Sequence, residues 1–185
     1  MPVSEQPLSL NEWVCLALLT EKPSHGFALA KQLAPDSDLG RILTVRRPLV
    51  YRALDRLLAA GLVHPQQVEP GASGPNRTVH APDAAAKRAV TRWLNTPVNH
   101  VRDLRVEFLV KLRLLERRGR QPDRLIERQR AVLGDTLDSL IQRSVQSDEA
   151  DVVDLWRANN AQAAQDFFAQ LDARVQPSQP RTTGK

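Results

Sequence analysis

The stretch that decides the fold is residues 46–63, RRPLVYRALDRLLAAGLV. A proline in the first turn of a helix loses no hydrogen bond, and a glycine just past the last turn readily adopts the left-handed conformation that ends many helices. Pro48 and Gly61 therefore predict a helix over residues 47–60. Its apolar residues recur every three or four positions and predict the buried face, which comprises Val50, Ala53, Leu54, Leu57 and Leu58.

Positive charge gathers on this helix and just before it. Residues 41–56 hold five arginines against one aspartate, a net charge of +4, whereas the whole chain of 185 residues carries +5. The guanidinium fork of arginine suits phosphate groups and guanine edges, although a genome rich in G and C would also raise the arginine content. Residues 147–172 are acidic instead, with six carboxylates against one arginine. A basic segment this short predicts a local anionic partner.

Two shorter helices are expected before this one. Ser9 and Glu12 have the spacing of a capping box and predict the start of a helix that ends before Pro23. A second helix is expected to start at Ser24 and to be closed by Pro35. The apolar residues within this second helix are Phe27, Leu29, Ala30 and Leu33.

The hydrophobic pattern changes after the third helix. Residues 62–69 and 77–81 are typical of two short strands, and residues 70–76 between them form a turn-rich loop. Asp83 is then expected to cap a fourth helix that runs to Leu94. Three short helices followed by a hairpin are the element order of a winged helix-turn-helix, whose third helix enters the major groove of DNA.

The second half of the chain is predicted to be helical throughout. Residues 119–122 and 147–148 separate three amphipathic helices. Their apolar stripes include Phe108, Leu112, Leu133, Leu137, Trp156 and Phe167. These stripes exceed what one chain can cover, so we expect a homodimer.

The expected fold class is therefore mainly α with a small two-stranded β wing. A winged helix-turn-helix DNA-binding domain is expected over residues 8–97 and a helical dimerisation domain over residues 98–174. Residues 175–185 are expected to form a disordered tail.

Catalysis and metal binding are not expected. Cys15 is the only cysteine and lies in an apolar helix, which favours an inert buried thiol. The four histidines are scattered without metal-ligand spacing, and no glycine-rich phosphate loop occurs, so we expect no cofactor. The longest apolar run, residues 13–19, is too short to span a bilayer, and no secretory signal is visible. We therefore expect a cytoplasmic protein that is not an enzyme.

The residues expected to meet double-stranded DNA lie on the third helix and the wing. Arg46 and Arg47 stand at the helix N-terminus, where the helix dipole also attracts phosphate. Arg52 and Arg56 are four positions apart and share one face of the helix. Arg77 directly follows the wing loop, where it could contact a phosphate or the minor groove. Two alternatives remain: these arginines could form a plain solvated face, or bind an acidic partner in a helical protein–protein interaction scaffold without DNA binding. RNA binding is disfavoured because Tyr51 is the only aromatic residue near the basic segment.

Several segments also carry a family resemblance. They are residues 24–30 (SHGFALA), 50–57 (VYRALDRL), 61–63 (GLV), 74–77 (GPNR), 83–94 and 101–108 (VRDLRVEF). In this order they resemble the PadR family of bacterial transcriptional regulators, over about residues 8–115. Departures include His80, Asp83, Ala86 and the Arg46-Arg47-Pro48 turn, so the operator cannot be inferred from relatives. The resemblance implies a dimeric DNA-binding protein, usually a repressor, in which Tyr51 also meets DNA and a small molecule releases it.

A possible effector site is suggested by Trp156, Asn159 and Asn160 on one predicted helix. Their amides could fix the register of helix pairing, face solvent or line a pocket beside the indole. The resemblance favours a pocket for a small planar or aromatic effector between the DNA-binding and helical parts. Trp13 and Trp93 are the candidates on the DNA-binding side, or else plain core residues.

Overall fold

The computed structural model describes residues 7–70, 76–146 and 151–175, and the chain divides into two compact units. Unit 1 comprises residues 1–96 and 105–121, and unit 2 comprises residues 97–104 and 122–185. Residues 105–121, which the sequence groups with the C-terminal helices, pack with the N-terminal unit. The predicted loop tip and tail lie outside the described residues, except for residues 70, 76 and 175.

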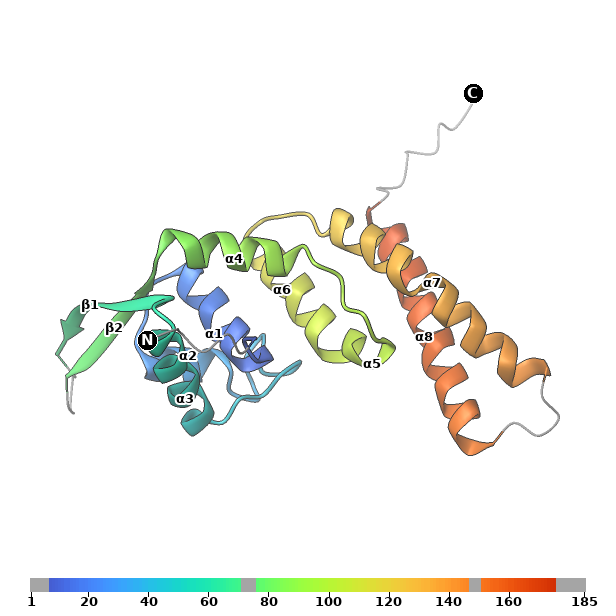
Figure 1. Ribbon diagram of the computed structural model, residues 1–185, viewed down its shortest axis with the longest axis horizontal. Helices are drawn as coiled ribbons and strands as arrows, with labels where there is room; N and C mark the ends of the chain where they lie inside the picture. Colours follow the sequence, from blue (N-terminus) through green and yellow to red (C-terminus); the bar gives the residue numbers. More distant parts are fainter. Residues whose placement is uncertain (1–6, 71–75, 147–150, 176–185) are drawn as a thin grey trace, which may run out of the picture. The chain divides into compact units, whose positions relative to one another are not determined.

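Unit 1 confirms the mainly helical fold with a two-stranded wing. Its elements are α1 (Leu10–Glu21), α2 (Gly26–Gln32), α3 (Arg47–Ala59), β1 (Val63–Glu69), β2 (Arg77–Pro82), α4 (Ala84–Leu94) and α6 (Leu109–Arg117). Helix α1 lies between α3 and α4 (Figure 1). It forms the centre of the core, because every side chain from Val14 to Leu19 is buried.

Local capping signals act as the sequence predicts. Ser9 and Glu12 form a capping box on α1, in which the Glu12 carboxylate accepts a hydrogen bond of 2.8 Å from the Ser9 N–H. Gly61, with φ of +68°, ends α3: its N–H donates to the carbonyl of Leu58, and the next N–H donates to the carbonyl of Leu57. Asp83 caps α4 by accepting a hydrogen bond from the N–H of Ala86. These helix ends are therefore fixed by residues adjacent in sequence.

The prediction that Ser24 starts α2 is wrong by one residue. His25 is the N-cap, and its Nδ1 accepts a hydrogen bond of 3.1 Å from the N–H of Ala28. Ser24 instead pairs with His80 of β2 through two backbone hydrogen bonds, of 3.0 and 3.2 Å. This pairing holds Ser24 extended, so tertiary contact decides where the helix begins. The helix also ends earlier than predicted, at Gln32, with Leu33 as its C-cap.

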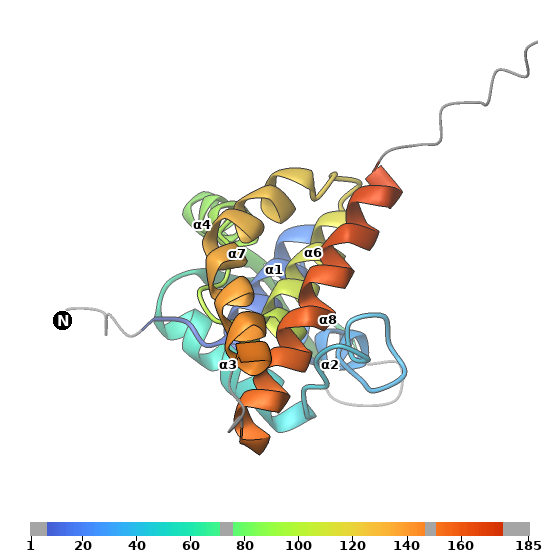
Figure 2. The same cartoon turned by 90° about the vertical axis from the view of Figure 1, so that its right-hand side faces the viewer.

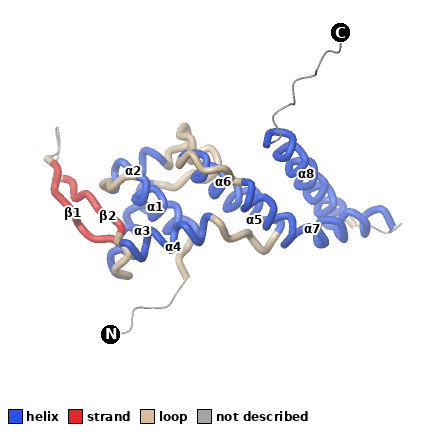
Figure 3. Tube along the Cα trace, turned by 90° about the horizontal axis from the view of Figure 1, so that it is seen from above, coloured by secondary structure: helices blue, strands red, loops and turns tan. Residues whose placement is uncertain are grey.

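The wing is an antiparallel hairpin that extends away from the helices of unit 1 (Figure 3). Its pairing runs from Val63 opposite Pro82 to Glu69 opposite Arg77, with a bulge after Pro65. Proline has no N–H to donate to the ladder, which accounts for an irregularity at this point. Only the end of the hairpin nearest the helices is buried, so the rest of β1 faces solvent.

Helix α6 packs with unit 1 because charged groups tie it to α1 and to the loop after α2. Arg117 pairs with Glu21 of α1 at 2.7 Å and with Asp38 of the loop at 3.1 Å. Arg113 also pairs with Asp38, and Arg118 donates a hydrogen bond to the carbonyl of Ala17. These contacts join residues about 75–100 positions apart in sequence.

Unit 2 is a helical hairpin with a short additional helix. It contains α5 (Val101–Asp103), α7 (Asp123–Gln146) and α8 (Val152–Val175), and α7 and α8 run side by side (Figures 1 and 2). A π-helical turn, η1 (Leu104–Phe108), follows α5 and leads into α6. Buried Gln129 of α7 holds the segment before α5, since its side-chain amide bonds both the N–H and the carbonyl of Val98. Within the described residues, none of the helices is both long and apolar enough to cross a membrane.

Candidate nucleic-acid interface

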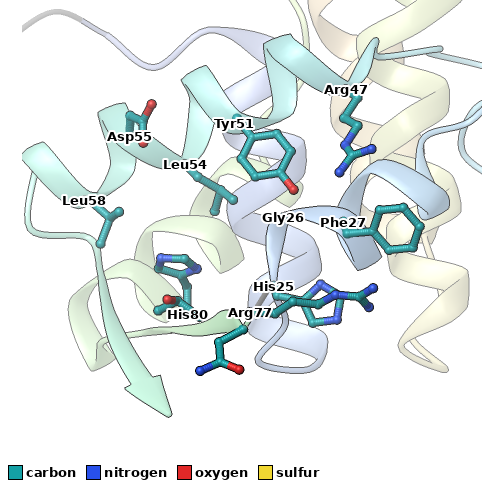
Figure 4. Close-up of a pocket in the computed structure, with 12 residues that line it drawn as sticks. His25, Gly26, Phe27, Arg47, Tyr51, Leu54, Asp55, Leu58, Arg77 and His80 are labelled. Carbon is teal, nitrogen blue, oxygen red and sulfur yellow. The ribbon is translucent and has the colours of Figure 1, made fainter. Parts of the chain in front are cut away.

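Three elements of unit 1 meet around one open cavity of about 420 Å³ (Figure 4). They are the start of α2, the outer face of α3 and the start of β2. The lining residues are His25, Gly26, Phe27, Arg47, Tyr51, Leu54, Asp55, Leu58, Asn76, Arg77, Thr78 and His80. The cavity therefore joins the helix expected to read DNA to the wing.

Two arginines lie against one aromatic ring at this cavity. The guanidinium carbon of Arg47 is 5.1 Å from the ring centroid of Phe27, and that of Arg77 is 4.9 Å from it. Arg47 also lies 5.7 Å from the ring of Tyr51. These distances are within the range of cation–π attraction. The structure thus brings together Arg47, Tyr51 and Arg77, three residues that the sequence proposed for DNA binding, and adds Phe27.

Sequence reasoning missed Phe27 as a site residue because it counted it among the apolar residues of α2. In the structure the side chain is exposed to 41%, whereas Leu29 and Leu33 of the same segment are fully buried. The unequal burial of these residues follows from packing against other elements, such as α3, which a short helix does not reveal in its own sequence.

The arginines of α3 lie in different environments. Arg46, Arg47 and Arg52 are exposed, and no side chain caps the N-terminus of α3, so its positive dipole end remains open. Arg56 is half-exposed, but its Nε lies 3.2 Å from Oε1 of Glu12, a buried carboxylate of α1. Arg56 therefore also fixes α3 against α1.

Close approach of α2 and α3 depends on Gly26. A Cβ atom at this position would lie 2.8 Å from Cε1 of Tyr51 and 3.1 Å from a methyl group of Leu54. Such a distance to a ring carbon is shorter than van der Waals contact allows, so a larger residue would displace the ring. Gly26 thereby positions Tyr51 on the outer face of α3.

Asp55, Leu58 and His80 line the other end of the cavity (Figure 4). Nδ1 of His80 is buried and has no hydrogen-bond partner among the described residues. Burial lowers the pKa of His80 below its ordinary value, although the carboxylate of Asp55 acts in the opposite direction. The imidazole is therefore neutral at pH 7, and the positive charge of the cavity comes from its arginines.

The four residues suggested for an effector do not form one site within either unit. Trp13 and Trp93 stack in unit 1, with ring centroids 5.4 Å apart and planes inclined by 3°. The indole N–H of Trp93 donates to Glu107, which also pairs with the buried Lys111 at 2.7 Å. Trp156 and Asn159 are exposed on α8 of unit 2, and none of the four residues lines the cavity described above.

Comparison with known proteins finds a family match over part of the chain. Residues 15–90 match the model of the family described as "Transcriptional regulator PadR-like family". A search of curated proteins returned no match.

Two solved structures are similar to the chain. One is Bacillus subtilis PadR in complex with operator DNA, at 13% identity over 90% of this chain and 98% of that one, with a TM-score of 0.46. The other is smu.1604c from Streptococcus mutans UA159, at 16% identity over 88% of this chain and 98% of that one, with a TM-score of 0.41. The family match over residues 15–90 confirms, for that part of the chain, the resemblance to the PadR-like family of transcriptional regulators that the sequence predicts.

Proposed function

We propose that the chain is a sequence-specific regulator of transcription that binds double-stranded DNA as a homodimer and represses. The observation that carries this proposal is the gathering of Arg47, Tyr51 and Arg77 around one open cavity between α3 and the wing. On this proposal α3 enters the major groove, which accommodates a helix. The family match supports the class of partner.

The exposed residues proposed to contact DNA fall into groups that would contact different parts of it. Arg46 and Arg47 at the open N-terminus suit a backbone phosphate, since helix dipole and guanidinium act together there. Tyr51 and Arg52, one turn further on, suit base edges in the groove. Arg77 at the start of β2 suits a phosphate or the minor groove beside the wing.

Phe108, Leu112, Leu133 and Leu137, which the sequence analysis expected to need a second chain, are buried within the single chain. Dimerisation is supported instead by the beginning of α8. Four large apolar side chains stay exposed there in the single chain: Val152, Val153, Leu155 and Trp156. Burying one large apolar side chain stabilises an assembly by about 1.5–3 kcal/mol. We therefore propose that a second copy of unit 2 packs against these four side chains and buries them. A two-fold dimer predicts an operator of two similar half-sites about one helical turn apart.

Repression and release by a small planar effector rest on the family resemblance. In the structure Trp156 and Asn159 are accessible on α8, whereas Trp13 and Trp93 stack on each other. Fluorescence titration with planar aromatic compounds, followed together with DNA release, tests the effector. Quenching that is unchanged in both Trp156→Phe and Asn159→Ala would place ligand binding elsewhere.

The deciding experiment is a footprint on the DNA beside the chain's own coding region, with affinity measured over a range of salt. Neutralising phosphates releases counterions, so log K should fall linearly with log salt by about 0.9 per phosphate contact. Arg52→Ala should weaken operator binding, whereas Arg124→Ala, the same charge change on α7 of unit 2, should not. Binding that is absent, or insensitive to salt, would refute DNA binding and leave an acidic protein as the partner.

A further inference from the structure

We propose that Phe27 is a positioning residue for DNA binding: its ring holds the guanidinium groups of Arg47 and Arg77, and so ties the first turn of α3 to the first residue of the wing strand β2. This inference rests on the proposed DNA-binding function. It assigns a role to a residue of α2, a helix to which the distribution of basic residues does not point.

Phe27 is itself held in place by its neighbours. It is the second residue of α2, directly after Gly26, which lies close against Tyr51 and Leu54 of α3. The imidazole of His25 caps this helix and stacks beside the Phe27 ring, with centroids 6.3 Å apart. Ser24 is bonded to β2 through both of its backbone groups with His80. The start of α2 is therefore fixed to the wing on one side and to α3 on the other.

The Phe27 ring orients the two guanidinium groups without neutralising their charge. The face of an aromatic ring is electronegative and attracts a cation, but it carries no net charge. Among the described residues, no ion pair joins Arg47 or Arg77 to a carboxylate. Arg56 shows the contrast, because its charge is balanced by Glu12. Arg47 and Arg77 are thus restrained and still carry full charge toward a phosphate.

Phe27 is not part of the buried core. The side chain is exposed to 41%, and the apolar interior of this segment is filled by Leu29, Leu33 and Leu39, which are fully buried. Long side chains lose conformational entropy when they bind, so restraining them beforehand favours binding. The ring supplies this restraint for two arginines on two different elements (Figure 4).

The test compares Phe27→Leu with Phe27→Tyr in the full-length chain. Leucine keeps an apolar side chain but has no aromatic face, whereas tyrosine keeps the face. Affinity for an operator duplex is measured by fluorescence anisotropy at several salt concentrations. We expect F27L to raise Kd by roughly fivefold to thirtyfold, from two lost cation–π contacts. It should also lower the salt slope by about one to two, and F27Y should stay within about twofold of the wild type.

A double-mutant cycle adds a readout that a loss of stability would not reproduce. Arg77→Ala should weaken binding less in the F27L background than in the wild type, because the ring no longer positions Arg77. The same is expected for Arg47→Ala. If F27L lowers Tm, Phe27→Met repeats the comparison with a more flexible apolar side chain.

The outcomes separate this inference from the proposed function. A wild type without salt-dependent binding refutes DNA binding, and the role of Phe27 with it. If the wild type binds DNA but F27L leaves Kd and the salt slope unchanged, and the effect of Arg77→Ala is the same in both backgrounds, the role of Phe27 alone is overturned. Equal losses in F27L and F27Y would also overturn it, since tyrosine keeps the aromatic face.

Discussion

Nε of Arg56 lies 3.2 Å from Oε1 of Glu12, so one exposed arginine of α3 is anchored to a buried carboxylate of α1. Glu12 is at the same time the acidic member of the capping box that begins α1. A single carboxylate therefore fixes both the start of the central helix and the last turn of α3. This relationship separates Arg56 from Arg52, although the two are four residues apart on one helix.

Arg56→Ala should lower stability and Arg52→Ala should not. Removing Arg56 leaves the buried Glu12 without its ion-pair partner, which we expect to cost about 1 kcal/mol. Thermal unfolding measures the difference, and operator affinity at fixed salt is measured alongside. For Arg52→Ala we expect an unchanged Tm with weaker DNA binding. Equal Tm values for both variants would mean that the Glu12 pair contributes nothing to folding.

Gly26→Ala should destabilise unit 1 and weaken DNA binding by displacing the Tyr51 ring. The added methyl would lie 2.8 Å from Cε1 of Tyr51, and overpacking of this kind costs about 1–3 kcal/mol. Combining it with Tyr51→Ala should recover much of the stability, since the clashing ring is removed. Gly134→Ala is the matched control: its Cβ meets nothing within 4 Å, and alanine favours a helix by about 0.5–1 kcal/mol. A G26A variant as stable as the wild type would show that α2 and α3 can move apart freely.

Leu155→Asp combined with Trp156→Asp should convert the proposed dimer to a monomer. Both side chains are more than half exposed in the single chain, and charges there would oppose burial against a second copy. Sedimentation velocity at micromolar concentration measures the outcome. Val68→Asp, at a similarly exposed apolar position on β1, should remain dimeric. A wild-type chain that sediments as a monomer would contradict the proposed assembly.

Cys15 should resist thiol reagents until the chain unfolds. Burial, together with the nearby charge of Glu12, raises the pKa of Cys15 to about 12. The folded state therefore favours the neutral thiol, whereas the unfolded chain loses this proton above about pH 9. The contribution of Cys15 to stability is thus present below about pH 9 and is lost as pH rises toward 12. Ellman's reagent at pH 8, with and without denaturant, checks the expected protection, and fast labelling of the native chain would contradict it.

The sequence predicts those parts of the fold that depend on neighbouring residues. Pro48 and Gly61 bound α3 within a residue, and Ser9, Glu12 and Asp83 cap the helices expected of them. The start of α2 was mispredicted because Ser24 is held by His80, 56 positions away. No local pattern reports such a pairing.

The candidate site was predictable only in part, for the same reason. The basic charge of α3 is visible in the sequence, since it is dense and lies on one helix. The position of Phe27 between arginines of α3 and β2 is not visible, because it depends on how three elements pack. The ion pair of Arg56 with Glu12 likewise joins two helices, and the sequence around either residue does not indicate which side chain it pairs with.

The contacts of α6 determine where the chain can be cut. A fragment that stops at residue 97 would lose the partners of Glu21 and Asp38, and would uncover the faces against which Leu114 and Leu115 of α6 are buried. The smallest autonomous piece that keeps the DNA-binding surface should therefore extend through residue 121. Limited proteolysis should release a resistant fragment of that length, and a shorter recombinant piece should aggregate. A fusion of unit 1 to another protein would therefore need its junction after α6, and not directly after the wing and α4.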